Sequence, residues 1–181
     1  IIRRDGSHVL LGRDARESGE EIIHTVAQTL KNAGVSVTIA GILPTPTILF
    51  LTRTQNYDGA MIITASHNPK EYNGLKFVTS HGMFLNEHEI DELKKIYELH
   101  LEKTDRKILH DNAQKSALQQ NDVFIKYENN LGSKHVHHIV ESVNSELIRS
   151  KKFSVVLDPI NSAGAIITPD LLRQLGCDVT V

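Results

Sequence analysis

Apolar and polar positions follow two periods along this chain, one typical of strands and one typical of helices. An apolar run over residues 8–12 predicts a first strand, and apolar residues at helical spacing over 22–33 predict the helix that follows. Gly34 can adopt the left-handed conformation that ends a helix, and alternating apolar positions over 35–39 predict a second strand. Strands alternating with helices predict an α/β fold with a mixed, largely parallel sheet flanked by helices.

Two helix starts have the spacing of a capping box, in which serine or asparagine is followed three residues later by glutamate. These are Ser18 with Glu21 and Asn86 with Glu89. In a capping box, the two side chains accept hydrogen bonds from backbone N–H groups that have no partner inside the helix. We therefore expect a helix to begin at each pair.

The remaining elements follow from shorter apolar runs. We expect a short helix over 47–54, strands over 60–63, 76–78 and 154–158, and helices over 123–131 and 135–148. Residues 103–120 are polar and lack a clear period, so we expect a connection there with some helix at its end.

The segments 31–39 and 173–181 are similar to each other. Each passes from the end of an amphipathic helix through a glycine into alternating strand positions. The punctuation common to all α/β units explains this similarity as well as a second domain built like the first does.

The composition is that of an ordinary globular protein, with 40% of the 181 residues hydrophobic and 23% charged. The formal net charge of −2 gives no basic field for nucleic acid or an anionic membrane, and no apolar run approaches the roughly 20 residues that span a bilayer. The single cysteine, Cys177, excludes a disulfide framework and favours a reducing compartment. We therefore expect a cytoplasmic protein without nucleic-acid or membrane partners.

Three nearby histidines, His135, His137 and His138, raise the question of a metal site. Their spacing does not place three imidazoles on one helical face, and no cysteine or acidic residue completes a zinc set. We expect them on a solvated helix face.

A serine after an apolar strand is the strongest candidate for chemistry. Ser66 follows the strand expected over 60–63, in the run Thr64-Ala65-Ser66-His67-Asn68-Pro69. Ligand sites of open α/β sheets gather at the carboxyl ends of strands, and small residues before the serine leave room for a bulky substrate. The alternative is a turn serine that bonds its own backbone. Ser66 lacks the flanking glycines of a hydrolase nucleophile, which argues against acyl transfer.

The serine run and the segment Glu71-Tyr72-Asn73-Gly74-Leu75-Lys76 together closely resemble the active-serine loop of the α-D-phosphohexomutases, the phosphomannomutase and phosphoglucomutase superfamily. Two further family segments resemble Gly12-Arg13-Asp14-x-Arg16 and Ile42-Leu43-Pro44-Thr45-Pro46-Thr47. The resemblance covers most of the chain and is weakest over 103–150.

This resemblance implies an intramolecular phosphotransferase that interconverts hexose 6-phosphate and hexose 1-phosphate, with mannose or glucose phosphate as substrate. Phosphorylated Ser66 would pass its phosphoryl group to the sugar, forming a hexose bisphosphate, and would then recover the other phosphoryl group. The alternatives are a phosphoglucosamine mutase and a non-catalytic sugar-phosphate-binding module.

The resemblance also implies roles for residues near Ser66. His67 would donate a ring N–H to a phosphate oxygen, and Lys76 would act as general acid or base. Asn68 and Arg13 would bind phosphate. As alternatives, His67 and Asn68 only fix the turn, Arg13 is a buried partner of Asp14, and Lys76 is a solvated lysine at a strand end.

Family members bind Mg²⁺ through an Asp-Gly-Asp-x-Asp-Arg loop that this sequence does not contain. The resemblance therefore implies that Mg²⁺ would meet this chain only through the phosphoryl group on Ser66. Its other ligands would come from missing domains of the same protein. We expect residues 1–150 to form the first domain and 151–181 to begin a second, similar α/β domain. The chain starts at Ile1 without methionine and ends inside an expected strand, so we expect a fragment that is inactive alone.

Overall fold

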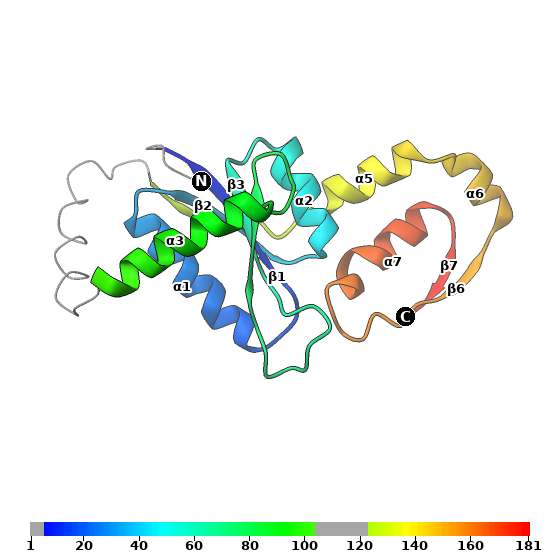
Figure 1. The fold of residues 1–181 in the computed structure, drawn as a ribbon. Helices are drawn as coiled ribbons and strands as arrows, with labels where there is room; N and C mark the ends of the chain where they lie inside the picture. Colours follow the sequence, from blue (N-terminus) through cyan, green and yellow to red (C-terminus); the bar gives the residue numbers. More distant parts are fainter. Residues whose placement is uncertain (1–5, 104–122) are drawn as a thin grey trace.

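The computed structural model describes residues 6–103 and 123–181, and its centre is a five-stranded sheet in the order β4-β3-β1-β2-β5 (Figure 1). The strands are β1 (His8–Arg13), β2 (Ser36–Ile42), β3 (Gly59–Ile63), β4 (Leu75–Thr79) and β5 (Ile125–Tyr127). All neighbouring strands are parallel except β3 and β4, which are antiparallel. This confirms the predicted mixed, largely parallel sheet.

Two helices cover opposite faces of the sheet because neighbouring residues of β1 point to opposite sides. Val9 and Leu11 pack with α1 (Ser18–Asn32), while Leu10 packs with α2 (Thr45–Thr54). All three side chains are fully buried. Burial of each contributes on the order of 1.5–3 kcal/mol, so β1 anchors both halves of the core.

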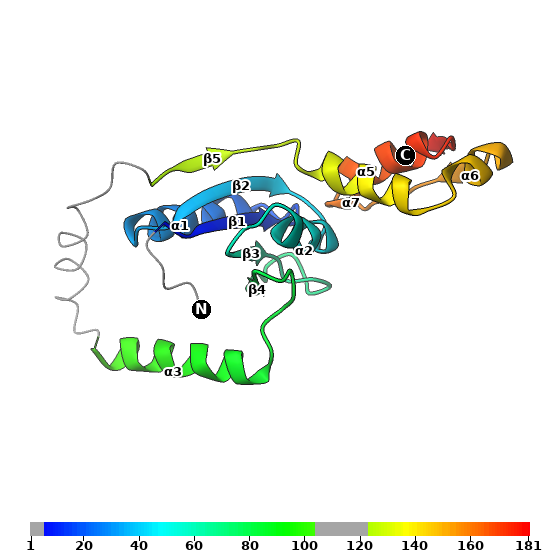
Figure 2. The same ribbon diagram turned by 90° about the horizontal axis from the view of Figure 1, so that it is seen from above.

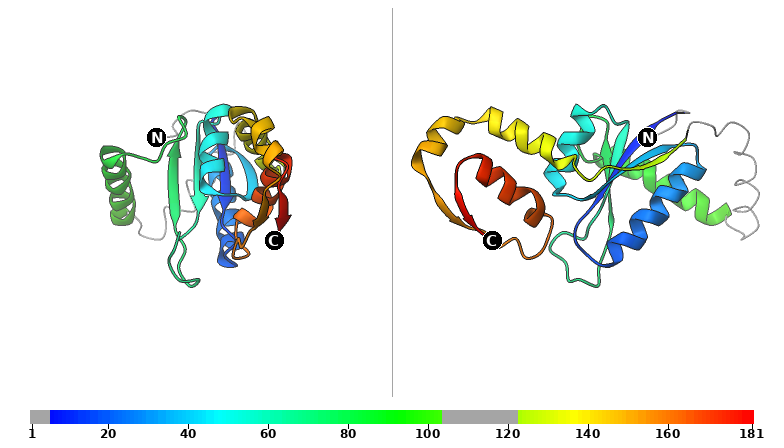
Figure 3. Two further views of the ribbon diagram at one scale, coloured as in Figure 1. Left: turned by 90° about the vertical axis from the view of Figure 1, so that its right-hand side faces the viewer. Right: turned by 180° about the vertical axis from the view of Figure 1, so that it is seen from behind.

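The helix after β4 is α3 (Glu87–Lys103), and it stands away from the sheet in Figures 2 and 3. Its capping box is confirmed. The Asn86 backbone N–H donates to Glu89 Oε2 at 2.8 Å, and the Glu89 backbone N–H donates to Asn86 Oδ1 at 3.0 Å. No described helix is long and apolar enough to cross a membrane.

The C-terminal unit has its own small sheet. Its elements are α5 (Gly132–Ser142), α6 (Ser145–Lys151), β6 (Ser154–Val156), α7 (Gly164–Gln174) and β7 (Asp178–Thr180), and β6 pairs with β7 in parallel. Helix α5 packs against both α7 and α2. At Gly132 a Cβ would lie 2.8 Å from Ile167 Cγ2 and 2.9 Å from Leu43 Cδ2, so glycine permits this close approach. The division at residue 150 stays a prediction.

One predicted helix was wrong, and another is interrupted. In place of the helix expected over 123–131, the chain forms the strand β5, which pairs with the open edge of β2, and then a turn that leads into α5. The helix expected over 135–148 is interrupted at Val143, where φ is −116° and ψ is 164°. There Asn144 Oδ1 accepts a hydrogen bond from the Leu147 backbone N–H at 3.0 Å and starts α6.

The capping box expected at Ser18 was also wrong. Helix α1 already includes Ser18, and its N-cap Glu17 makes no side-chain capping bond. The Ser18 hydroxyl instead accepts a hydrogen bond from Asn73 Nδ2 at 3.0 Å, which ties the helix to the Ser66 loop. Gly34 has φ of +82° just after α1, as predicted. Apart from residue 103, the connection expected over 103–120 lies outside the described residues.

Candidate active site

Ser66 lies three residues beyond the end of β3, in a turn where it adopts an unfavourable backbone conformation. Its φ is 57°, a left-handed conformation that is uncommon for a residue other than glycine. The Ser66 backbone N–H donates to Thr64 Oγ1 at 3.0 Å, and the Thr64 hydroxyl donates to Asp14 Oδ2 at 2.7 Å. The strained serine is therefore held by a chain of bonds that leads back to the loop after β1.

That loop reaches Ser66 because β1 and β3 are parallel neighbours that end at the same edge of the sheet. Arg13 pairs with Ile63 at the last position of both strands. The Asp14 backbone N–H donates to the Ile63 carbonyl at 3.0 Å. The carboxylate of Asp14 accepts bonds from the Arg16 backbone N–H at 3.1 Å and from Arg16 Nε at 3.0 Å. Asp14 thus links the two loops.

Arg16 holds the Ser66 loop by its carbonyl groups. Its two terminal nitrogens donate to four backbone oxygens: those of Ser66 at 2.9 Å, Asn68 at 2.8 Å, Pro69 at 2.6 Å and Tyr72 at 3.1 Å. Together with the bond to Asp14, these contacts occupy all of the donors that a guanidinium has. The Arg16 side chain is only 13% exposed. In this structure Arg16 shapes the loop and has no N–H left for a phosphate.

Arg13, one of the predicted phosphate-binding residues, does not line either cavity that contains Ser66. Its guanidinium pairs with Glu20 and donates to the Asp14 carbonyl at 3.1 Å. The hydrogen bond with His24, and then the charge and hydrogen bond of Arg13, lower the pKa of Glu20 below its ordinary value. The Arg13 side chain is 14% exposed, which fits the alternative of a buried structural partner.

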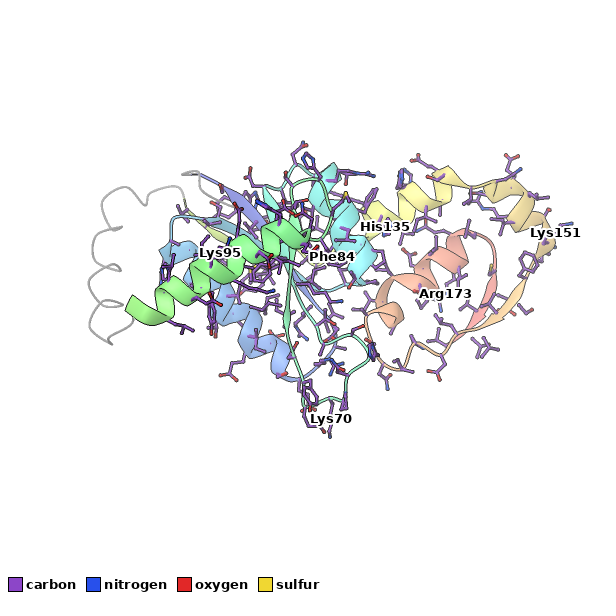
Figure 4. All side chains as sticks on the ribbon, in the orientation of Figure 1. Lys70, Phe84, Lys95, His135, Lys151 and Arg173 are labelled. Atoms are coloured by element: carbon purple, nitrogen blue, oxygen red, sulfur yellow. The ribbon has the colours of Figure 1, made fainter. Side chains whose placement is uncertain are left out.

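Two cavities open at Ser66. The larger, about 410 Å³, contains Ser66 and His67, and the smaller, about 340 Å³, contains Ser66 and Asn68. The structure therefore brings three predicted residues together. Lys70, which sequence reasoning missed, lines the smaller cavity and lies at the far end of the loop in Figure 4.

The cavities are bordered by residues from the β1 and β3 loops, from the start of α2 and from the turn before α7. The larger cavity also touches Pro44, Thr45 and Ala163, at the N-terminal ends of α2 and α7. These helix ends favour negative charge, because unpaired backbone N–H groups and the helix dipole meet there. The cavity is thus suited to an anionic group.

Several cavity side chains keep their hydrogen-bonding capacity unused. Within residues 6–103 and 123–181, no hydrogen bond engages the side chains of Ser66, His67, Asn68, Lys70, Asn161 or Ser162. The supporting groups of Asp14, Arg16 and Thr64 are, by contrast, bonded to one another or to the loop. The site therefore combines a fixed frame with free polar groups, as a polar ligand requires.

Lys76, the predicted acid or base, is not brought to Ser66. It lies on β4 opposite Ile62, and its Nζ is 5.6 Å from the centre of the Phe84 ring. There it lines an apolar groove of about 450 Å³ between β4 and α3, which Ser66 does not line.

The three histidines do not all lie on a solvated face, so that expectation was wrong for His135. Its Nδ1 is 2.9 Å from Thr47 Oγ1, and its ring stacks on Phe50 at 4.6 Å, between α2 and α5 (Figure 4). His138 stacks on the same phenylalanine at 4.8 Å. Burial, and then the nearby His138, lower the pKa of His135. The described residues contain no group of three or more His, Cys, Asp or Glu that would hold a metal ion.

Comparisons with known proteins show which family the chain belongs to. Residues 1–104 match the family described as phosphoglucomutase/phosphomannomutase, alpha/beta/alpha domain I. The chain is 35% identical to a phosphoglucosamine/phosphogalactosamine mutase of Sulfurisphaera tokodaii, over 96% of this chain and 36% of that protein. It is 34% identical to a phosphoglucomutase/phosphomannomutase of Thermococcus kodakarensis, over 99% of this chain and 37% of that protein.

A solved structure shows the same fold. A phosphoglucomutase/phosphomannomutase family protein of Burkholderia thailandensis superposes with a TM-score of 0.69 at 23% identity, over 97% of this chain and 35% of the other. The chain thus spans about a third of the length of the relatives it matches.

Proposed function

Because the chain belongs to the phosphoglucomutase/phosphomannomutase family, we propose that it carries the phosphoserine of a mutase that interconverts hexose 6-phosphate and hexose 1-phosphate. One observation carries the proposal. Ser66 stands in a left-handed turn fixed from below by Thr64 and Arg16, while its own hydroxyl has no bond within the described residues and borders two cavities.

The proposed reaction has two transfers. In the first, a free hydroxyl of the sugar phosphate attacks the phosphorus on Ser66. The bond from phosphorus to serine Oγ breaks, a base takes the proton of the sugar hydroxyl, serine Oγ gains a proton, and a hexose bisphosphate forms. After the sugar turns over, the serine hydroxyl attacks the other phosphoryl group and loses its proton. The bond from that phosphorus to the sugar oxygen breaks, the sugar oxygen gains a proton, and the hexose monophosphate is released. Such transfers depend mainly on positioning and on stabilising charge at the phosphoryl oxygens.

This chain's residues support that chemistry by holding the carrier still. Arg16 fixes four carbonyls of the loop, and these contacts do not involve the Ser66 hydroxyl that would carry phosphate. We assign His67 and Asn68 as donors to the phosphoryl oxygens because each lines a cavity with Ser66. Arg13 is reassigned to a supporting role beside Glu20.

Lys76 remains our proposal for the group that exchanges a proton with the sugar hydroxyl, on the strength of the family resemblance. Its ammonium group lies over Phe84, so the side chain has to swing away from that ring to act at Ser66. His67, which already lines the larger cavity with Ser66, is the competing candidate.

Magnesium does not fit the described residues alone. They form no acidic metal-binding group, and the Asp14 carboxylate beside Ser66 is occupied by Arg16 and Thr64. We propose that Mg²⁺ binds a phosphoryl group on Ser66 with its remaining ligands from outside this chain. For the same reason, we propose that the 181-residue chain is inactive as a mutase on its own.

A second candidate substrate has its own support. The Sulfurisphaera relative is named for amino sugars, so an amino-sugar phosphate is the alternative to glucose or mannose phosphate.

The experiment that tests the proposed function uses the full-length protein that contains this chain. Conversion of glucose, mannose and glucosamine phosphates is followed with Mg²⁺ and the matching bisphosphate. We expect one conversion to be abolished by Ser66→Ala and kept by Ser80→Ala. Binding of sugar phosphates without any conversion would support the non-catalytic binding module instead.

A further inference from the structure

A turn of the C-terminal unit forms part of the wall around Ser66. Ile160 and Ser162 line both cavities that contain Ser66, and Asn161 lines the smaller one. This turn follows β6 and leads into α7, whereas Ser66 follows β3 (Figure 1). The site is therefore built from two units that are far apart in the sequence.

The turn has an unusual backbone. Ile160 has φ of 49° and Asn161 has φ of 51°, and the left-handed region is especially unfavourable for a β-branched residue such as isoleucine. With Ser66, three of the five non-glycine residues of positive φ in the described ranges line the smaller cavity. Conformations of this kind cluster at ligand sites, where the strain fixes the direction of nearby groups.

Burial of Ile160 does not compensate for its strain, because the side chain is 80% exposed. The turn is closed by its own bonds: the Ile160 backbone N–H donates to Asp158 Oδ1 at 2.9 Å, and the Ser162 backbone N–H donates to the Pro159 carbonyl at 2.9 Å. These bonds fix the turn and so place Asn161 and Ser162 at the cavity wall.

Both residues offer donors to a ligand. The Asn161 amide carries two N–H donors and the Ser162 hydroxyl carries one. Neither side chain has a hydrogen-bond partner within residues 6–103 and 123–181. A phosphoryl group on Ser66 would bring close to two negative charges and three acceptor oxygens into the cavity they share.

We propose that Asn161 and Ser162 complete the phosphoryl-binding site of Ser66, donating hydrogen bonds from the C-terminal unit to the phosphoryl oxygens. The inference rests on the proposed role of Ser66 as phosphoryl carrier. The turn before α7 would therefore make these hydrogen bonds only when Ser66 is phosphorylated.

The test places phosphoserine at position 66 of the 181-residue chain by genetic encoding, and titrates the phosphate by ³¹P NMR. Asp14 and Lys70 line the same cavity and shift the second phosphate pKa in opposite directions, so each variant is compared with wild type. Donors to the dianion stabilise it and lower that pKa. Asn161→Gly allows the left-handed backbone without strain and removes the side chain with its amide, and should raise that pKa by on the order of 0.5 unit. Ser162→Ala should act in the same direction.

The matched control is Asn56→Gly, since Asn56 also has a positive φ, of 55°, but lines neither cavity at Ser66. It should leave the titration unchanged. Identical titrations for wild type, Asn161→Gly and Ser162→Ala would overturn the inference. Because the phosphate is installed directly, this result does not depend on transfer from a sugar. Failure of the proposed function would appear separately, as a full-length protein that accepts no phosphate on Ser66 from a hexose bisphosphate.

Discussion

Replacing Arg16 with lysine tests whether one side chain holds the serine loop in place. Lysine keeps the positive charge but has no planar fork, so it cannot reach the four loop carbonyls and Asp14 at once. We expect Arg16→Lys to free the loop around Ser66 while the sheet stays folded, since the cores on both sheet faces do not include Arg16.

The size of the effect follows from the bonds lost. A net hydrogen bond contributes about 0.5–1.5 kcal/mol, and bonds to a charged group contribute more. If lysine keeps one or two of the five bonds, loop closure is weakened by about 2–4 kcal/mol, which corresponds to an increase in loop opening on the order of 10²-fold. Misplacement of the carrier should lower the mutase rate by a similar factor.

Hydrogen exchange of the Ser66 and Asn68 amides measures the opening directly, since these N–H groups bond to Thr64 Oγ1 and the Ala65 carbonyl. The matched control is Arg149→Lys, because within the described residues Arg149 donates to a single carbonyl, that of Gln174 at 3.0 Å. It should leave exchange in the Ser66 loop unchanged. Unchanged exchange in Arg16→Lys would refute the view that this guanidinium fixes the loop.

Three further predictions concern other parts of the molecule. In the full-length protein, Lys76→Ala should lower the mutase rate by a factor on the order of 10² to 10⁴, and Lys76→Arg should not restore it, because a guanidinium does not release a proton near neutral pH. Wild-type rates in both variants would show that Lys76 only contacts Phe84 and takes no part in proton transfer. Burial holds the pKa of the His135 imidazole below 6.5, so its stabilising contribution is full above that pH and is lost as the pH falls through the lowered pKa. Between about pH 7.5 and about pH 5.5, the melting temperature should therefore drop less in His135→Gln than in wild type. The control His137→Gln should behave like wild type. Gly132→Ala should lower the free energy of unfolding by about 1–3 kcal/mol, because its Cβ would lie 2.8 Å from Ile167 Cγ2. The control Gly164→Ala, where the nearest atom is at 3.7 Å, should cost clearly less. Equal losses measured by urea denaturation would contradict the tight approach of α5.

The central elements could be predicted from the sequence because their patterns are local. The fully buried run in β1 and the apolar stripe of α1 each specify an element without help from the rest of the chain. The strand β5 could not be predicted in this way, since it has only three residues and its pairing is decided by the open edge of β2. At Ser18, contact with Asn73 replaced the local capping bond.

The site was predictable in its residue types and less so in its geometry. A motif identified Ser66 and its neighbours, and the structure places His67 and Asn68 at the same cavities. The motif could not show that Arg16 donates its hydrogen bonds to the loop carbonyls, or that Lys76 turns towards Phe84, because both contacts depend on distances across the fold. Asn161 carried almost no signal beyond its preference for turns, and its place beside Ser66 depends on how the two units pack.

The most direct test of the central claim is a chase of the phosphoryl group. The full-length protein is phosphorylated with a hexose bisphosphate and then separated from the excess sugar. Peptide mass analysis locates the phosphate and should find it on Ser66. A hexose monophosphate is then added, and the phosphate on the protein and in the sugar is counted over time. We predict that phosphate leaves Ser66 and appears in hexose bisphosphate in equal amount. Phosphate found on Ser80 or Ser162, or released from Ser66 to water as inorganic phosphate, would contradict the account.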